Sequence, residues 1–160
     1  SLKKIAYFTA LLLCFVSVRA FAQANSLPVL TPIGPQAAAE NAPLSVAVSA
    51  SDLESIPALT TSTLPTGASF TDNLNGTGSL SWTPDFTQSG VYNVTFFATD
   101  DSLAVDSEIV AITVTNVNQA PVLALIGPQA VNENVLLSIA TSASDADGTI
   151  PALTATGLPL

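Results

Sequence analysis

The sequence has almost no positive charge, and the little that it has lies near one end. Its 160 residues hold twelve acids against three Lys and Arg residues, with no His. All three cations, Lys3, Lys4 and Arg19, lie near the start of the chain. Residues 23–160 contain all twelve acids and no cationic side chain. The formal charge of this segment is therefore about −12, compared with −9 for the whole chain. Such a segment repels nucleic acids and anionic membranes, and it attracts cations.

Missing nucleophiles and metal ligands narrow the possible chemistry further. Cys14 is the only cysteine, and it precedes residue 23. Without His or Lys, no general base is available for a Ser or Thr nucleophile, and no nitrogen or sulfur ligand is available for zinc. Carboxylate chemistry and the binding of a hard metal ion stay open. Because disulfides are excluded as well, stability must come from core packing, ions or neighbouring modules.

Residues 1–22 have the pattern of a secretory signal peptide. Two lysines form a positive n-region, residues 5–18 form an apolar h-region, and residues 20–22 (AFA) form a small-residue cleavage site. The apolar run is shorter than the ~20 residues that a membrane-spanning helix needs. We therefore expect a secreted, extracellular or cell-surface protein. Its mature segment has no membrane span and starts with a short linker, residues 23–27.

One phrase occurs twice and organises the rest of the chain. Residues 28–65 read PVLTPIGPQAAAENAPLSVAVSASDLESIPALTTSTLP, and residues 121–159 read PVLALIGPQAVNENVLLSIATSASDADGTIPALTATGLP. The copies lie about 93 residues apart, which is the size of one small all-β module. We therefore expect a first module at residues 28–120 and the start of a second at residues 121–160, a tandem repeat whose second copy is truncated.

Alternating hydrophobic residues predict an all-β sandwich of about seven strands, and helical periodicity is absent. A kink at Gly34-Pro35 is expected to move the first strand to the opposite sheet. Asn75-Gly76 predicts a type I′ hairpin turn with positive φ at both residues. The core positions expected from the alternation are Leu44, Val46, Val48, Phe70, Leu80, Trp82, Tyr92, Val94, Phe96, Ala98, Val110, Ile112 and Val114.

The order of several motifs resembles a known family of repeats. The motifs are E-N, A-S-D-x-[ED], L-P-x-G-A-x-F, W-T-P, Q-S-G-x-Y-x-V-x-F-x-A-x-D and N-x-x-P-V-L. In this order they resemble the cadherin-like and immunoglobulin-like repeats of secreted bacterial surface proteins, over residues 28–160. Tyr92, two residues after Gly90, resembles the tyrosine corner of immunoglobulin-like sandwiches. The resemblance implies an immunoglobulin/cadherin-like β-sandwich with a structural or adhesive role and no enzyme activity.

The resemblance also implies Ca²⁺ at the junction between modules. Cadherin-type repeats bind Ca²⁺ with carboxylates of both modules and oxygens of the linker. Carried over by motif, the junction ligands are Glu40, Asn116, Asn118, Asp145 and Asp147. Ca²⁺ takes six to eight oxygen ligands and accepts carboxylates and amide carbonyls alike.

A second, partial set of ligands is expected at the N-terminal end of the first module. It consists of Asp52, Glu54 and Asp100, while Glu133 is expected to serve a later junction. The linker has Asn118-Gln119-Ala120 where the family pattern has an acid, so weak binding is expected, about 10⁻⁴–10⁻³ M. An alternative stays open, in which the acids cap turns and keep the surface soluble.

The leading prediction is a non-catalytic extracellular structural or adhesion repeat. Its partners are neighbouring repeat modules and a cell-surface protein or polysaccharide. The alternative is an accessory module, a spacer or a carbohydrate-binding unit, of a larger secreted enzyme. A third hypothesis, a glycoside hydrolase, needs one carboxyl with a raised pKa in an apolar cleft. Here the acids lie in turn and linker phrases that both repeats share, which favours a junction over a cleft.

Overall fold

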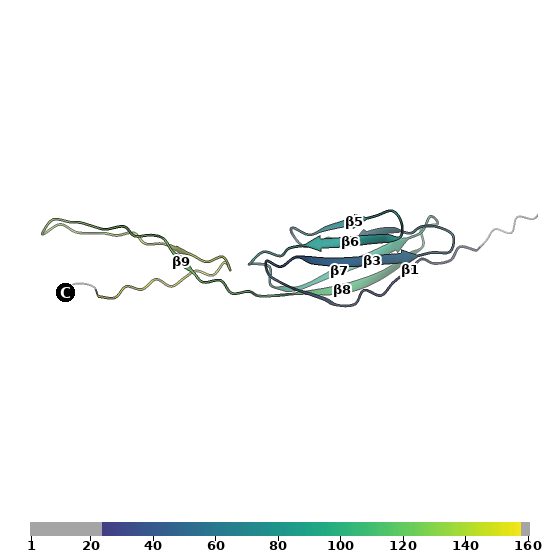
Figure 1. The fold of residues 1–160 in the computed structure, drawn as a ribbon, viewed down its shortest axis with the longest axis horizontal. Helices are drawn as coiled ribbons and strands as arrows, with labels where there is room; N and C mark the ends of the chain where they lie inside the picture. The colour runs from purple at the N-terminus through teal and green to yellow at the C-terminus, as the bar shows by residue number, and fades with distance from the viewer. Residues whose placement is uncertain (1–23, 158–160) are drawn as a thin grey trace, which may run out of the picture.

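The computed structural model describes residues 24–157, and the predicted signal peptide lies outside this part. The strands of its N-terminal part are β1 (Val29–Leu30), β2 (Gln36–Ala39), β3 (Leu44–Ser51), β4 (Ala58–Thr61), β5 (Ser69–Asp72), β6 (Thr77–Trp82), β7 (Gly90–Thr99) and β8 (Val105–Thr115). They form two four-stranded sheets, ordered β1-β3-β6-β5 and β2-β8-β7-β4 (Figure 1). The predicted all-β sandwich is confirmed, with eight strands. Within residues 24–157, no helix is long and apolar enough to cross a membrane.

The first strand changes sheets at the predicted kink. β1 pairs with β3 in one sheet, whereas β2 runs parallel to β8 in the other, and Gly34 between them has φ of +68°. Carboxylates of β8 hold this crossing. Glu108 accepts hydrogen bonds from the N–H groups of Ile33 and Gly34, both at 2.9 Å, and Asp106 accepts one from Leu30 at 2.8 Å. Two acids thus satisfy main-chain donors that lie between the sheets.

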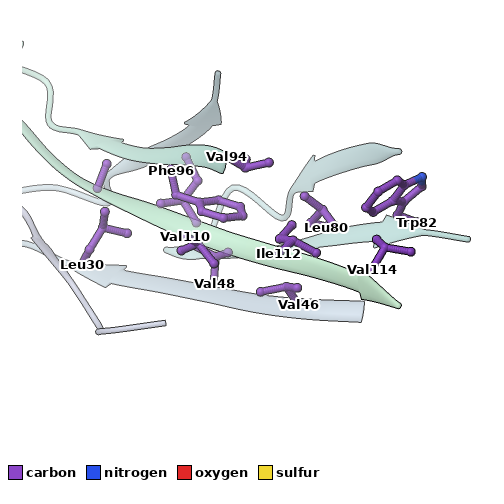
Figure 2. Packing of buried hydrophobic residues seen from close by; sticks show 12 residues of the cluster. Leu30, Val46, Val48, Leu80, Trp82, Val94, Phe96, Val110, Ile112 and Val114 are labelled. Atoms are coloured by element: carbon purple, nitrogen blue, oxygen red, sulfur yellow. The ribbon is translucent and has the colours of Figure 1, made fainter. Parts of the chain in front are cut away.

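Side chains from both sheets meet in one core (Figure 2). The buried hydrophobic residues are Leu30, Val46, Val48, Leu59, Leu80, Trp82, Val94, Phe96, Ala98, Val110, Ile112 and Val114. Of the predicted core positions, Leu44, Phe70 and Tyr92 are only partly buried and pack against this cluster. The alternation in β3, β6, β7 and β8 therefore predicts the inward faces correctly, because successive side chains of a strand point to opposite sides.

A tyrosine corner is present where the sequence predicts it. The Tyr92 hydroxyl donates a hydrogen bond of 3.0 Å to the carbonyl of Gln88, four residues upstream. The Tyr92 ring also packs edge-on against Trp82, with ring centroids 4.9 Å apart and planes at 82°. The corner therefore fixes the entry of β7 and closes one end of the core.

The prediction of a type I′ turn at Asn75-Gly76 is wrong. Positive φ occurs at Leu74 (59°) and Gly76 (78°), and Asn75 is not among the residues with positive φ. Side chains shape this loop instead. Asp72 Oδ1 accepts the Leu74 N–H at 2.9 Å, and Asn75 Oδ1 accepts the Thr77 N–H at 3.1 Å. These local side-chain hydrogen bonds favour a longer loop over the tight two-residue turn.

The second copy of the phrase repeats the strand pairing of the first. β9 (Val122–Leu123) is antiparallel to β10 (Ala143–Ser144), with Val122 opposite Ser144. In the first copy, Val29 of β1 lies opposite Ser51 of β3, the equivalent pair 93 residues earlier. Figure 1 shows this part as an extended arm that leaves the sandwich after the linker. Its core-equivalent side chains are not covered within the described residues. Leu123 is 56% exposed, whereas the equivalent Leu30 is 6% exposed.

Replacing Tyr92 by Phe tests the corner. Phe keeps the ring against Trp82 but loses the hydroxyl that donates to Gln88. We expect the free energy of unfolding to fall by about 1 kcal/mol, the usual contribution of one such hydrogen bond. Urea unfolding followed by tryptophan fluorescence measures this change. Ser89→Ala, at an exposed neighbouring position, serves as the control. Equal stability of Tyr92→Phe and the parent chain would contradict the assignment.

Candidate junction site

Glu40 forms the first-module side of the junction. It lies in the turn between β2 and β3, where the following Asn41 has φ of 57°, and it is only 3% exposed. Its Oε2 accepts a hydrogen bond of 2.8 Å from the N–H of Val117 in the linker. The Glu40 N–H donates to the Thr115 carbonyl at the end of β8. Oε1 is buried and has no hydrogen-bond partner.

Asp147, in the second copy of the phrase, binds the same linker. Its Oδ2 accepts a hydrogen bond of 2.7 Å from the N–H of Gln119. Its Oδ1 is buried and, like Glu40 Oε1, has no hydrogen-bond partner. The two linker N–H groups are two residues apart, which corresponds to roughly 6.6 Å along an extended chain. The junction therefore contains two carboxylates. In each, one oxygen accepts a hydrogen bond from a linker N–H, and the other is buried without a hydrogen-bond partner.

Two such oxygens make the junction a chemically suitable place for a hard cation. An unpaired buried carboxylate is costly unless a donor or a cation satisfies it, and this part of the chain contains no Lys, Arg or His. Within residues 24–157, however, no three acids gather into a metal-binding group. A cation here would therefore need further oxygens from amides, main-chain carbonyls or water. Carboxylate and amide oxygens are ligands that Ca²⁺ accepts.

The other predicted junction residues have less direct roles. Asn116 and Asn118 are exposed, and the Asn118 amide donates a hydrogen bond to the carbonyl of Gln119 at 3.1 Å. Asp145 shapes its own loop, since its carboxylate accepts the Asp147 N–H and the Thr149 hydroxyl, both at 2.9 Å. As ligands, these three residues stay a prediction. Glu133 is exposed, in the turn that repeats that of Glu40.

The N-terminal set repeats one junction contact. The Ser26 N–H donates to Glu54 Oε2 at 3.2 Å, which matches the bond from Gln119 to Asp147 in the second copy. The Ser26 hydroxyl donates to Asp52 as well, at 3.0 Å. The second acid of the A-S-D-x-[ED] motif thus holds the segment before the proline in both copies.

Asp100 and Asp52 also organise turns. Asp100 is 4% exposed, and its Oδ1 accepts the N–H groups of Ser102 and Ala104 at 2.9 and 2.8 Å. Its Oδ2 accepts the Asn25 amide at 2.7 Å. Desolvation acts to raise the pKa of Asp52, but hydrogen bonds, first those from the hydroxyls of Ser55 and Ser26, outweigh it and lower the pKa. The geometry of these two acids fits the turn-capping alternative.

Sequence reasoning missed the main-chain half of the site. The N–H groups of Val117 and Gln119 donate to Glu40 and Asp147. Because almost every residue type has a main-chain N–H, the sequence does not show which residues act as these donors. One signal was available. The N-x-x-P-V-L motif of the linker also occurs at residues 25–30, so the repeated unit begins three residues before the repeated phrase.

A comparison with protein families decides the classification. Residues 27–115, more than half of the chain, match the family described as "Putative Ig domain". The chain belongs to this immunoglobulin-like family. The match ends at the last residue of β8, so it coincides with the sandwich. Nothing in the comparison distinguishes a cadherin-like subtype, and no curated protein matches the sequence.

Solved structures share the fold of this immunoglobulin-like domain. The SrpA adhesin from Streptococcus sanguinis has 13% sequence identity and a TM-score of 0.52, over 59% of this chain and 60% of the adhesin chain. The sialic acid binding region of a Streptococcus sanguinis adhesin has 12% identity and a TM-score of 0.52, over 64% and 34%. An endo-fucoidan hydrolase from glycoside hydrolase family 107 has 20% identity and a TM-score of 0.50, over 59% and 14%. The likeness shows the fold alone, and it spans less than two thirds of each of these chains.

The acid dependence of folding tests the turn role of Asp52 and Asp85. Hydrogen bonds from the hydroxyl and then the N–H of Thr87 lower the pKa of Asp85, as hydrogen bonds lower that of Asp52. A depressed pKa in the folded state stabilises the fold above the unfolded-state pKa of about 3.9, and this contribution is lost as the pH falls through the folded-state pKa. We therefore expect the melting temperature to fall below about pH 4, and Asp52→Asn to flatten that dependence.

The control for this experiment is Asp101→Asn. Asp101 is exposed, and its carboxylate accepts a hydrogen bond of 3.4 Å from the Ser102 hydroxyl, a weak contact. Thermal melts between pH 2 and pH 7 compare the three chains. An acid dependence that Asp52→Asn leaves unchanged would contradict the turn role.

Proposed function

We propose that the chain is a non-catalytic extracellular repeat with a structural or adhesive role. In this proposal residues 1–22 are a secretory signal peptide, and the sandwich is one module of a secreted or surface-exposed array. The observation that carries the proposal is the junction. Glu40 of the sandwich and Asp147 of the second copy bind N–H groups two residues apart in one linker. Modules that both form hydrogen bonds with the linker between them suit an ordered array, in which each repeat contacts its neighbours.

In the same proposal, residues 121–160 are the start of a second module. Supporting this, β9 and β10 pair in the register of β1 and β3. A further hydrogen bond is repeated as well, since the Ala124 N–H donates to Ser142 as the Thr31 N–H donates to Ser49. The two copies of the phrase therefore share their strand pairing.

Ca²⁺ bound by Glu40 and Asp147 is the proposed means of stiffening the junction. The buried oxygens without partners, Oε1 of Glu40 and Oδ1 of Asp147, support a cation at this place. Asn116 and Asn118 in the linker are candidates for additional oxygen ligands. A bound cation would neutralise the two carboxylates and connect the two modules through one set of ligands.

An accessory module of a larger secreted enzyme is the alternative function. An endo-fucoidan hydrolase contains a region of this fold, which corresponds to 14% of that chain. On this alternative the sandwich would be a spacer or a carbohydrate-binding unit beside a catalytic domain. A glycan or cell-surface protein as the partner is compatible with both proposals, and the sialic acid binding region of an adhesin, which contains a region of this fold, is bound to 3'sLn.

Thermal melts of the full chain with and without Ca²⁺ test the proposed junction. Ligand binding to the folded state alone raises stability by about 1.4 kcal/mol at a tenfold excess over Kd. We expect millimolar Ca²⁺ to raise the melting temperature of the parent chain. Glu40→Gln and Asp147→Asn should abolish this rise, because each removes one anionic ligand.

Without Ca²⁺, we expect Glu40→Gln not to destabilise the chain. Glu40→Gln keeps an oxygen for the Val117 N–H and removes a buried charge that has no cation, so its melting temperature should equal or exceed that of the parent chain. Asp101→Asn, on an exposed loop, should keep the full response to Ca²⁺. A Ca²⁺ response that Glu40→Gln and Asp147→Asn both retain would contradict the assignment of this site.

A further inference from the structure

One pole of the sandwich carries large aliphatic side chains on each of its loops. Strand register places residues 52–57, 73–76 and 100–104 at the same end, because Ser49 lies opposite Thr77 and Ala58 opposite Thr99. The segment before β1 departs from this end (Figure 1). Five exposed residues, here called the aliphatic crown, are Leu27 (67%), Leu53 (85%), Ile56 (67%), Leu74 (79%) and Leu103 (81%). Exposed apolar groups gathered in this way are typical of an interaction site.

Two leucines of the crown are held in an unfavourable backbone conformation. Leu74 has φ of 59° and Leu103 has φ of 67°, in the left-handed region. The other non-glycine residues with positive φ in the described part are Asn41 and Asn134, and Asn tolerates this region far better. Leucine at an exposed loop tip therefore costs backbone energy without gaining burial. Such strain is typical of binding sites, where the side chain is needed for another contact.

The second copy provides an internal comparison. Beside the linker junction, Ala120 and Ala146 stand where the first copy has Leu27 and Leu53, whereas Ile150, the equivalent of Ile56, is 96% exposed. At the opposite pole of the sandwich, the loops 40–43, 64–68 and 83–89 hold none of the large exposed hydrophobic residues of the described part. The crown therefore has two large aliphatic side chains, Leu27 and Leu53, at positions where the copy beside the linker junction has alanine.

Carboxylates beside the crown indicate the charge of its partner. Asp52, Glu54 and Asp101 lie on the crown loops, and the chain has no cationic side chain after Arg19. A surface hollow of about 390 Å³ lies at this pole, lined by Leu27, Val29 and Leu53 together with Ser26, Ser51 and Asp52. Apolar walls with an acidic edge complement apolar side chains that are flanked by cations. Residues 20–160 of a second copy of this chain lack those cations.

We propose that the aliphatic crown docks a polypeptide segment of a partner protein that presents apolar side chains flanked by Lys or Arg. This inference goes beyond the proposed function, which assigns no docking surface to the module. It also does not depend on Ca²⁺ at the linker, because Glu40 and the linker lie at the opposite end of the sandwich.

Methyl NMR of the full chain tests the proposal with a synthetic amphipathic peptide of Leu and Lys as the probe. The Leu53 methyl signals report binding at the crown separately from binding anywhere else on the chain. We expect saturable shifts of these signals in the parent chain. The double variant Leu74→Asn, Leu103→Asn should weaken binding at least tenfold. Its melting temperature should equal or exceed that of the parent chain, because Asn adopts positive φ at lower cost.

Two controls make the outcome specific. Val91→Thr with Ile109→Thr removes residues that are 65% and 70% exposed on the outer sheet face, and it should leave the affinity unchanged. A Leu and Glu peptide of the same length should bind at least tenfold more weakly than the Leu and Lys peptide. Equal affinity of the crown variant and the parent chain, or equal binding of both peptides, would overturn the proposal. Crown-dependent binding to phosphatidylcholine vesicles without binding of the peptide would overturn it as well.

Discussion

Twelve carboxylates in a segment that has no cationic side chain of its own are the constraint on which the described part of this structure depends. The chain has twelve acids and no Lys, Arg or His after residue 19, so these carboxylates need neutral donors. Main-chain N–H groups supply them. Glu108 and Asp106 hold the crossing of the first strand between the sheets, and Asp100 holds the turn before β8. The acids therefore act as local organisers of loops, in a module whose stability otherwise comes from core packing.

The junction is the place where neutral donors are insufficient. Glu40 and Asp147 each accept a linker N–H with one carboxylate oxygen. The other oxygen of each is buried and has no hydrogen-bond partner. In the function proposed above, a hard cation neutralises these carboxylates, which would connect the charge of the chain to the order of a tandem array. At the opposite pole, the acids beside the aliphatic crown lie near solvent. Their negative charge favours a partner segment that carries Lys or Arg.

The core was predictable from the sequence, and the partners of the acids were not. Alternation places Trp82, Phe96 and Ile112 inside, since a strand side chain points either inward or outward. The hairpin between β5 and β6 is present, but its type I′ turn was predicted wrongly, because a hydrogen bond to the Asp72 side chain reshapes the loop and a turn motif does not include such bonds. The contact between Glu40 and Val117 joins residues 77 positions apart through a main-chain N–H, which residue identity does not reveal.

An amide NMR titration of the full chain with Ca²⁺ tests the central claim most directly. The amide protons of Val117 and Gln119 donate to the two carboxylates, so they report on the charge of both groups. The account predicts saturable shifts at these two amides with one common Kd, and smaller shifts around Asp52 and Asp100. Shifts confined to the Asp52 and Asp100 loops, or no saturable shift at either linker amide, would contradict a cation held between Glu40 and Asp147.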